Sequence, residues 1–438
     1  MDVPLEILDR EVARAAAELD RARLVLARDP ASAESPLATH RRVSSRETFL
    51  ELAEAKGPLV APLRAWVSTL TLERVLWSDT VRLASAWRAA TIPVEGPGLL
   101  AFLGAPRDLL LRVLREAEPT RRRFFADALA GGAAPVADAA RRLADRRAEA
   151  ARLLGVDLDA VEIPIEPGAA LTLIAERVLA DTAPFFEERG PWDASLSRGV
   201  GRSLGEGWPA RLRARWLFEL FHVGPLVEGL SLDLGPLPES LGASSFVRAL
   251  AAFGAALADA DGPRAFFVLA RAPFDLRRAR RSALFAGLAA DPIFGARALG
   301  LGRDRARDQA RGVARALVVS LRLDAARVLL RGALARPGAG VCFEERTAEA
   351  LGAPIPRALA GVVPRLGPGD PARLAGALVA ARDRRSLVDR FDEDWFKSPH
   401  AALAIREEDG SVPPSHLAPA AALEAGLAEL VRVVGELG

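Results

Sequence analysis

The 438-residue chain carries 59 basic and 57 acidic residues, and half of its residues are hydrophobic. This nearly balanced charge argues against a nucleic-acid partner, because such partners are steered by an excess of positive charge. The single cysteine, Cys342, excludes an intramolecular disulfide. All basic residues except Lys56 and Lys397 are arginines, and we assign this bias to genome composition, not to function.

Features of membrane and secreted proteins are absent from the sequence. The first 24 residues carry charges throughout, unlike a signal peptide, and no run of about 18 uncharged apolar residues occurs. We therefore predict a soluble, cytoplasmic protein with no membrane partner.

Helical periodicity runs through most of the chain. It is clearest over 303–335, where Ala or Leu recurs every three or four residues and arginines occupy the opposite face. Ser44 lies three residues before Glu47, as in a capping box, and Asp370 precedes a proline where a helix is expected to begin. The pattern predicts helices over 4–28, 45–55, 59–91, 106–117, 119–130, 134–154, 167–189, 209–223, 243–260, 262–272, 274–290, 303–335, 370–382, 384–396 and 417–436.

Strand signals are scarce. The segment 161–166 alternates briefly but contains a proline, and 340–345 is short. The helical signal lapses over 155–168, which places a boundary between an N-terminal lobe, 1–160, and a C-terminal lobe, 161–438. We predict an all-α fold, an irregular multi-helix globule of two helical lobes with a cleft, and not a regular solenoid.

One apolar segment, ARWLFELFHVGP (214–225), contains Glu219 and His222 on the same expected helix face. A self-satisfied buried pair, a metal half-site and an acid/base pair all fit this spacing. The Glu-x-x-His spacing occurs in di-iron bundles, which need a second copy, and the other three histidines have no glutamate three residues earlier. Upstream, the glycine-rich segment 197–209, with Glu206, is a candidate functional loop; its G-x-S-x-G match lacks the strand that a nucleophile elbow needs.

Familiar metal and nucleotide motifs are missing from the sequence. No two histidines lie four residues apart, as the zinc-peptidase helix requires, and neither lysine ends a glycine-rich phosphate loop. We therefore predict no metal and no cofactor.

The segment RRAEAARLLGVD resembles a helix of the thimet oligopeptidase and oligoendopeptidase families of helical metallopeptidases. Those enzymes carry an Arg-x-x-x-Ala-x-x-Leu-Gly pattern, matched here by Arg147, Ala151, Leu154 and Gly155. The resemblance implies a helical fold with a peptide-binding cleft.

A second stretch, Phe-Glu-Leu-Phe-His, resembles the His-Glu-x-x-His motif of the same families. By this resemblance Glu219 matches the general base and His222 the second zinc ligand, whereas Phe218 replaces the first ligand. Ser-Phe-Val-Arg resembles the stretch with the third ligand, and Arg248 stands in place of its glutamate. The resemblance therefore implies a peptidase-like relative without the zinc chemistry.

Together these features predict a non-catalytic, metal-free binding or scaffold protein that holds a peptide or protein segment in an inter-helix cleft. The alternative is a hydrolase-like enzyme with Glu206, Glu219 and His222 as its catalytic residues. A metal-binding helical oxidoreductase is a third possibility. The sequence does not specify the oligomeric state.

Overall fold

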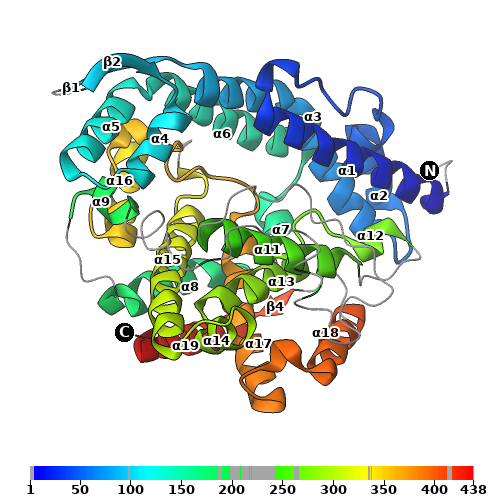
Figure 1. Ribbon diagram of the computed structural model, residues 1–438. Helices are drawn as coiled ribbons and strands as arrows, with labels where there is room; N and C mark the ends of the chain where they lie inside the picture. The colour runs from blue at the N-terminus through cyan, green and yellow to red at the C-terminus, as the bar shows by residue number, and fades with distance from the viewer. Residues whose placement is uncertain are drawn as a thin grey trace.

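The computed structural model describes residues 4–96, 99–185, 190–197, 208, 217, 219, 243–260, 266–333, 336, 338–411 and 417–437. Helices dominate this part of the chain, and the only sheets within it are two-stranded (Figure 1). The prediction of an all-α multi-helix fold is confirmed.

The described helices of the first half match the predicted ones in order, except that α7 and α9 lie in segments where no helix was predicted. They are α1 (Leu5–Arg28), α2 (Arg46–Glu54), α3 (Val60–Ala89), α4 (Pro106–Arg115), α5 (Pro119–Gly132), α6 (Ala134–Leu154), α7 (Leu158–Glu162), α8 (Ala170–Asp181) and α9 (Trp192–Leu196). Short 3-10 turns lie between them at η1 (Pro30–Ser32), η2 (Arg42–Ser44) and η3 (Ala183–Phe185).

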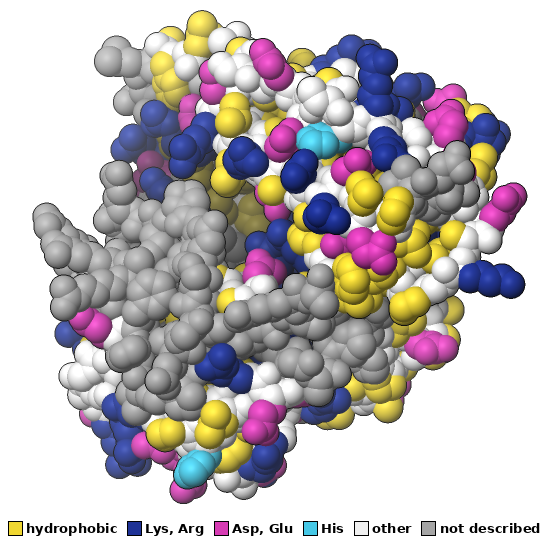
Figure 2. Space-filling model, turned by 90° about the vertical axis from the view of Figure 1, so that its right-hand side faces the viewer, with side chains coloured by type: hydrophobic (Ala, Val, Ile, Leu, Met, Phe, Trp, Pro, Cys, Tyr) yellow, Lys and Arg dark blue, Asp and Glu magenta, His cyan; other side chains and the backbone are white. Residues whose placement is uncertain are grey.

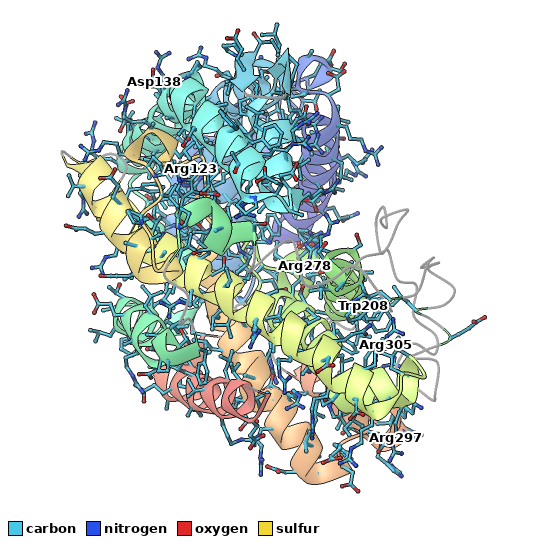
Figure 3. All side chains as sticks on the ribbon, turned by 60° about the vertical axis from the view of Figure 1, so that its left-hand side comes forward. Arg123, Asp138, Trp208, Arg278, Arg297 and Arg305 are labelled. Atoms are coloured by element: carbon cyan, nitrogen blue, oxygen red, sulfur yellow. The ribbon has the colours of Figure 1, made fainter. Side chains whose placement is uncertain are left out.

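The described helices of the second half differ more from the prediction. They are α11 (Ala243–Ala260), α12 (Phe267–Ala270), α13 (Leu276–Gly287), α14 (Pro292–Ala298), α15 (Arg303–Leu329), α16 (Ala339–Leu351), α17 (Asp370–Phe391), α18 (Pro399–Ser411) and α19 (Ala420–Leu437). The turns η5 (Leu288–Ala290), η7 (Arg357–Leu359) and η8 (Trp395–Lys397) connect some of them. Helix α15 crosses the molecule diagonally from the end marked by Arg305 (Figure 3).

The main errors of the helix prediction have local causes. The two helices expected over 370–396 are one, α17, followed by η8. Helix α16 was missed because Gly338 and Gly352, which flank it with positive φ, and Gly340 within it resemble loop residues. Helices α14 and α18 were also missed, since each begins at a proline that the sequence pattern presents as a break.

The strands form two small sheets. β1 (Ile92–Gly96) pairs antiparallel with β2 (Leu99–Gly104), and β3 (Ile165–Glu166) pairs parallel with β4 (Ala418–Pro419). The hairpin occupies a segment that was predicted to be only a break. The second sheet joins the middle of the chain to its C-terminal helix.

The N-cap of helix α2 lies one residue after the predicted cap, Ser44. The hydroxyl of Ser45 accepts a hydrogen bond from the backbone N–H of Thr48 at 3.2 Å, so Ser45 is the N-cap. Ser44 instead donates its hydroxyl to the carbonyl of His40. Asp370 is not the N-cap of α17 either, because it is the first residue inside the helix. Its carboxylate accepts a hydrogen bond from the backbone N–H of Gly367.

Three groups of buried apolar side chains form the core. One lies among α1, α2 and α3, a second extends from α3 and α5 to α17 and α19, and a third joins α11, α13, α17 and α18. The third group is aromatic-rich: Phe253 packs edge-on against Phe285, which in turn packs against Trp395. The division of the chain near residue 160 stays a prediction.

Glycines allow four helices of the C-terminal half to pack with their backbones almost in contact. A methyl group on Gly254 of α11 would overlap the Arg281 carbonyl of α13, and one on Gly426 of α19 would overlap the Leu378 carbonyl of α17. A methyl group on Gly376 of α17 would lie 2.7 Å from the carbonyl carbon of Ala279 in α13. Glycine is therefore required at each of these crossings.

Helix α11 is long and apolar enough to span a membrane by length and composition, and it alone meets that test within the described residues. However, 56% of the helix is buried inside the fold, where it packs on α13. These contacts are those of a core helix.

Several arginines of α5 and α13 are buried and paired. Arg122 of α5 is buried and contacts the carboxylate of buried Asp193 at 3.2 Å, and the exposed Arg123 contacts the same carboxylate at 3.1 Å. In α13, Arg280 pairs with Asp383, and Arg281 donates to the Ile405 carbonyl at 3.2 Å. These arginines stabilise the fold, because buried guanidinium groups are tolerated only with such partners.

Asp275 gives the stability a predicted pH dependence. Its Oδ1 caps α13 by accepting from the N–H groups of Arg277 and Arg278. Its buried Oδ2 accepts no hydrogen bond from the described residues and lies 3.7 Å from Nη2 of Arg277. Burial raises the pKa of Asp275 from 3.8 to about 6. The folded state therefore binds more protons than the unfolded state between these values, and the contribution of Asp275 to stability falls as the pH rises through this window.

We expect Asp275→Asn to gain stability relative to the wild type as the pH rises from 4 to 7, by at most about 3 kcal/mol. The amide keeps a capping oxygen but does not titrate. Urea unfolding of both proteins at several pH values measures this difference. The prediction would be contradicted if the free energy of unfolding changed equally with pH in the two proteins.

Candidate functional site

The predicted catalytic residues lie in a part of the chain that the structure describes only at isolated positions. Glu206 and His222 are outside the described residues, as is Phe218. Glu219 is helical and exposed, and Leu217 beside it is fully buried in the core group of α11 and α13. The pairing of Glu219 with His222 therefore stays a prediction.

The described anchors of this segment pack against the C-terminal helices. Trp208 lies 5.1 Å from Phe246 of α11, measured between ring centroids. Upstream, the segment expected to be a loop from residue 191 instead begins with the buried helix α9, whose Asp193 holds Arg122.

The residues that resemble a metallopeptidase zinc site do not fit a zinc ion. Arg248 is exposed on α11, and its Nε donates to the Ser244 carbonyl at 3.3 Å, so it supplies a cation where a carboxylate would be needed. A phenylalanine at 218 has no donor atom. Within the described residues, no group of three or more His, Cys, Asp or Glu side chains could hold a metal ion.

Three residues of the Arg-x-x-x-Ala-x-x-Leu-Gly pattern have structural roles, and the arginine lines a cavity. Ala151 and Leu154 are buried, and Gly155 ends α6 in the left-handed conformation at φ 74°. Arg147, earlier on the same helix, points into the cavity and forms an ion pair with Glu162 of α7.

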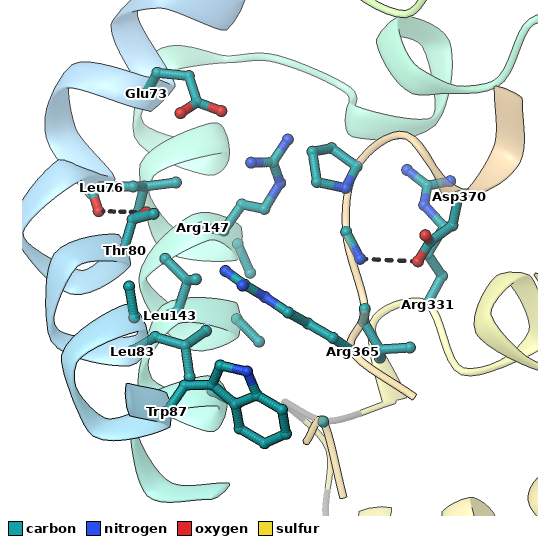
Figure 4. A pocket seen from close by; sticks show the side chains of 18 of the residues that line it. Glu73, Leu76, Thr80, Leu83, Trp87, Leu143, Arg147, Arg331, Arg365 and Asp370 are labelled. Carbon is teal, nitrogen blue, oxygen red and sulfur yellow. Dashed lines mark hydrogen bonds between the residues drawn. The ribbon is translucent and has the colours of Figure 1, made fainter. Parts of the chain in front are cut away.

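This large cavity has a volume of about 960 Å³. Helices α1, α3, α6 and α7 form one side, and the segment 361–370 forms the other together with Arg331, Gly332 and Arg336. The wall from α3 and α6 is partly apolar, with Leu76, Leu83, Trp87 and Leu143 facing the space (Figure 4). The space-filling view shows a hollow in the surface with hydrophobic side chains at its back and charged side chains at its rim (Figure 2).

Seven arginines and four carboxylates are among the described residues that line the large cavity. The carboxylates are all paired. Glu162, which is 2% exposed, lies between Arg147 and Arg331, and the Arg331 contact is 2.6 Å. Asp159 contacts Arg331, Glu73 contacts Arg23 at 2.9 Å, and Asp370 pairs with Arg373. The lining therefore has a surplus of positive charge.

Arg365 differs from the paired arginines. Its side chain extends from the 361–370 segment toward the wall of α3 and α6 (Figure 4), and no hydrogen bond or ion pair joins it to any described residue. Arg365 is an exposed residue, but the cavity walls around it desolvate the guanidinium group in part, and this desolvation lowers the pKa of Arg365 below its ordinary value. The cavity thus contains a cation that the fold leaves uncompensated within its described part.

A small pocket of about 320 Å³ adjoins the large cavity. Leu83, Trp87, Gly361 and Arg365 line both spaces, and we call these four residues the junction. The rest of the small pocket is mostly apolar, and its lining includes Leu110, Leu114, Val136, Leu196 and Leu323.

No protein-family model matches the chain, and no curated protein matches it. Among solved structures, it is similar to the crystal structure of oligoendopeptidase-F from Enterococcus faecium, with a TM-score of 0.50 over 99% of both chains. The fold resembles that of oligoendopeptidase-F. The sequence identity is 9%, so the likeness concerns the fold. It confirms the resemblance that short sequence stretches predicted.

Within this oligoendopeptidase-F-like fold, sequence reasoning found Arg147 but missed Trp87, Glu162 and Arg365. The segment 351–370 was treated as a break because it is rich in glycine and proline. Its two arginines, Arg357 and Arg365, gave no signal in a chain with so many arginines. Only the packing of 361–370 opposite α3 and α6 identifies Arg365 as a cavity residue.

Proposed function

We propose that the protein is a non-catalytic, metal-free binding protein that holds a peptide or protein segment in the large cavity. The size of the cavity carries this proposal, since about 960 Å³ lies at the upper end of the range of about 300–1,000 Å³ for ligand sites. The mixture of an apolar wall and charged groups suits a peptide, which has both kinds of surface.

The loss of zinc ligands supports a role without catalysis. Phe218 and Arg248 stand where the resembling peptidases have metal ligands, and a cation at 248 disfavours a second cation nearby. We further propose that the protein works in the cytoplasm without a nucleic-acid partner. The buried ion pairs of Arg122 in α5 and Arg280 in α13 support the proposal that nucleic acid is not a partner, because these two arginines are unavailable to phosphates.

Filling the cavity should weaken peptide binding. Ala144 of α6 lines the cavity and is half-buried, so Ala144→Trp should weaken the binding of short labelled peptides of mixed sequence by about tenfold or more. Fluorescence anisotropy measures this loss. Ala17→Trp, at an exposed position of α1 outside the cavity, is the matched control and should bind like the wild type.

The hydrolase alternative with Glu206, Glu219 and His222 predicts a different result. Peptides incubated with the wild type would be cleaved, and cleavage would be lost in folded His222→Ala and Glu219→Gln variants. Mass spectrometry of the peptides separates the two functions. Such a loss would contradict the non-catalytic proposal, whereas intact peptides with unchanged binding would support it.

A further inference from the structure

The junction places one uncompensated cation beside an apolar pocket. Arg365 has no described partner, and it lines both the large cavity and the small pocket. Trp87 and Leu83 lie at the same place and continue the apolar lining of the small pocket. A ligand that occupies the junction must therefore satisfy a guanidinium group and an apolar space at adjoining positions.

We propose that the junction binds the C-terminal residue of a peptide, with the free carboxylate at Arg365 and a large apolar side chain in the small pocket. This inference rests on the proposed function and adds to it the chemistry of the preferred peptide end.

A carboxylate is the group that this site lacks. The four carboxylates of the cavity lining are held by Arg23, Arg147, Arg331 and Arg373, which leaves Arg365 without a counter-charge among the described residues. An ionised carboxylate can pair with this exposed but partly desolvated guanidinium group. Arginine binds a carboxylate through two parallel N–H···O bonds, which also fixes the orientation of the ligand.

The terminal residue of a peptide fits the junction better than an internal acidic residue does. A C-terminal leucine or phenylalanine carries its carboxylate and its apolar side chain on one Cα atom, so the two groups can enter adjoining sites together. An internal aspartate or glutamate supplies the charge but leaves the small pocket empty. The 320 Å³ of that pocket is near the lower limit for a ligand site, which suits one side chain.

The test compares three labelled peptides that differ only at the C-terminus: a free acid ending in leucine, its amide, and a free acid ending in glycine. For the full-length wild type, we expect the leucine acid to bind about 10- to 100-fold more tightly than the amide. The glycine acid should be weaker than the leucine acid by about tenfold. Isothermal titration calorimetry or anisotropy provides the dissociation constants.

Variants then assign the effect to Arg365. Arg365→Gln should bind the leucine acid and its amide alike, and Arg365→Lys should restore part of the preference. Arg357→Gln, which removes an arginine of η7 that pairs with Glu344 and lines neither space, is the matched control. Because Arg365 contacts no described partner, its replacement should not lower the melting temperature.

The outcomes separate this inference from the proposed function. Equal binding of acid and amide by the wild type would overturn the C-terminal anchor and leave peptide binding intact. Absence of binding by all three peptides, under conditions where mixed peptides also fail, would overturn both. If decanoate bound in an Arg365-dependent manner and the peptides did not, the site would belong to an anionic amphiphile and the inference would be wrong. The three peptides are compared on the wild type, so the inference can be tested even if a variant fails to fold.

Discussion

Replacing Gly426 with alanine should lower the free energy of unfolding by roughly 3 kcal/mol. The added methyl group would overlap the backbone carbonyl of Leu378, so α19 would have to move away from α17. A backbone carbonyl in the middle of a helix has no rotamer by which to yield. Both helices contribute to the largest core group, and their separation would expose its apolar side chains. Chemical denaturation followed by circular dichroism measures the loss.

The control is the same substitution where space is available. A methyl group on Gly131 of α5 would meet no atom within 4 Å, and alanine has the better helix propensity, so Gly131→Ala should be neutral or slightly stabilising. A loss at Gly131 as large as that at Gly426 would show that close helix packing is not the cause.

Replacing Arg322 with leucine should cost roughly 2–4 kcal/mol. Arg322 is buried in α15, and it donates to the carbonyls of Leu179, Glu349 and Ala350, which lie near the ends of α8 and α16. Leucine would leave these acceptors without their donor, and two of them belong to the buried residues Leu179 and Ala350. The opposing gain comes from removing a desolvated charge, since burial lowers the pKa of Arg322 to about 10. The free-energy cost of leaving three carbonyls without a donor outweighs that gain.

Arg315→Leu, at an exposed position on the same helix, is the matched control and should change stability by less than about 0.5 kcal/mol. Thermal and urea unfolding of both variants provide the comparison. A stable Arg322→Leu protein would mean that water or rearranged helix ends satisfy the three carbonyls.

The fold was predictable wherever the apolar period was regular and flanked by caps. Helix α15 buries Ala306, Ala310, Ala314 and Val328, as its spacing predicted. Elements that begin at proline or lie between glycines were missed, because these residues serve both loops and helix ends. The antiparallel pair of β1 and β2 was missed for the same reason: β1 contains Pro93 and Gly96, residue types that also mark breaks between helices.

The candidate site was less predictable than the fold. Local spacing drew attention to Glu219 and His222, which are three residues apart in the sequence. The cavity instead joins residues from α3 and from the 361–370 segment, nearly 300 positions apart in the chain. No periodicity within one segment can report such a contact. The buried guanidinium groups of α13 were missed similarly, since their partners Asp383 and Glu408 belong to distant helices.

The charged lining of the large cavity has one consequence for how a ligand would be released. Its described cations are all arginines, and histidine is absent from its described lining. Arginine keeps its proton across the whole range of cellular pH, so mild acidification would not switch off the attraction for an anion. Release would instead respond to ionic strength, to competition by other anions or to separation of the two walls.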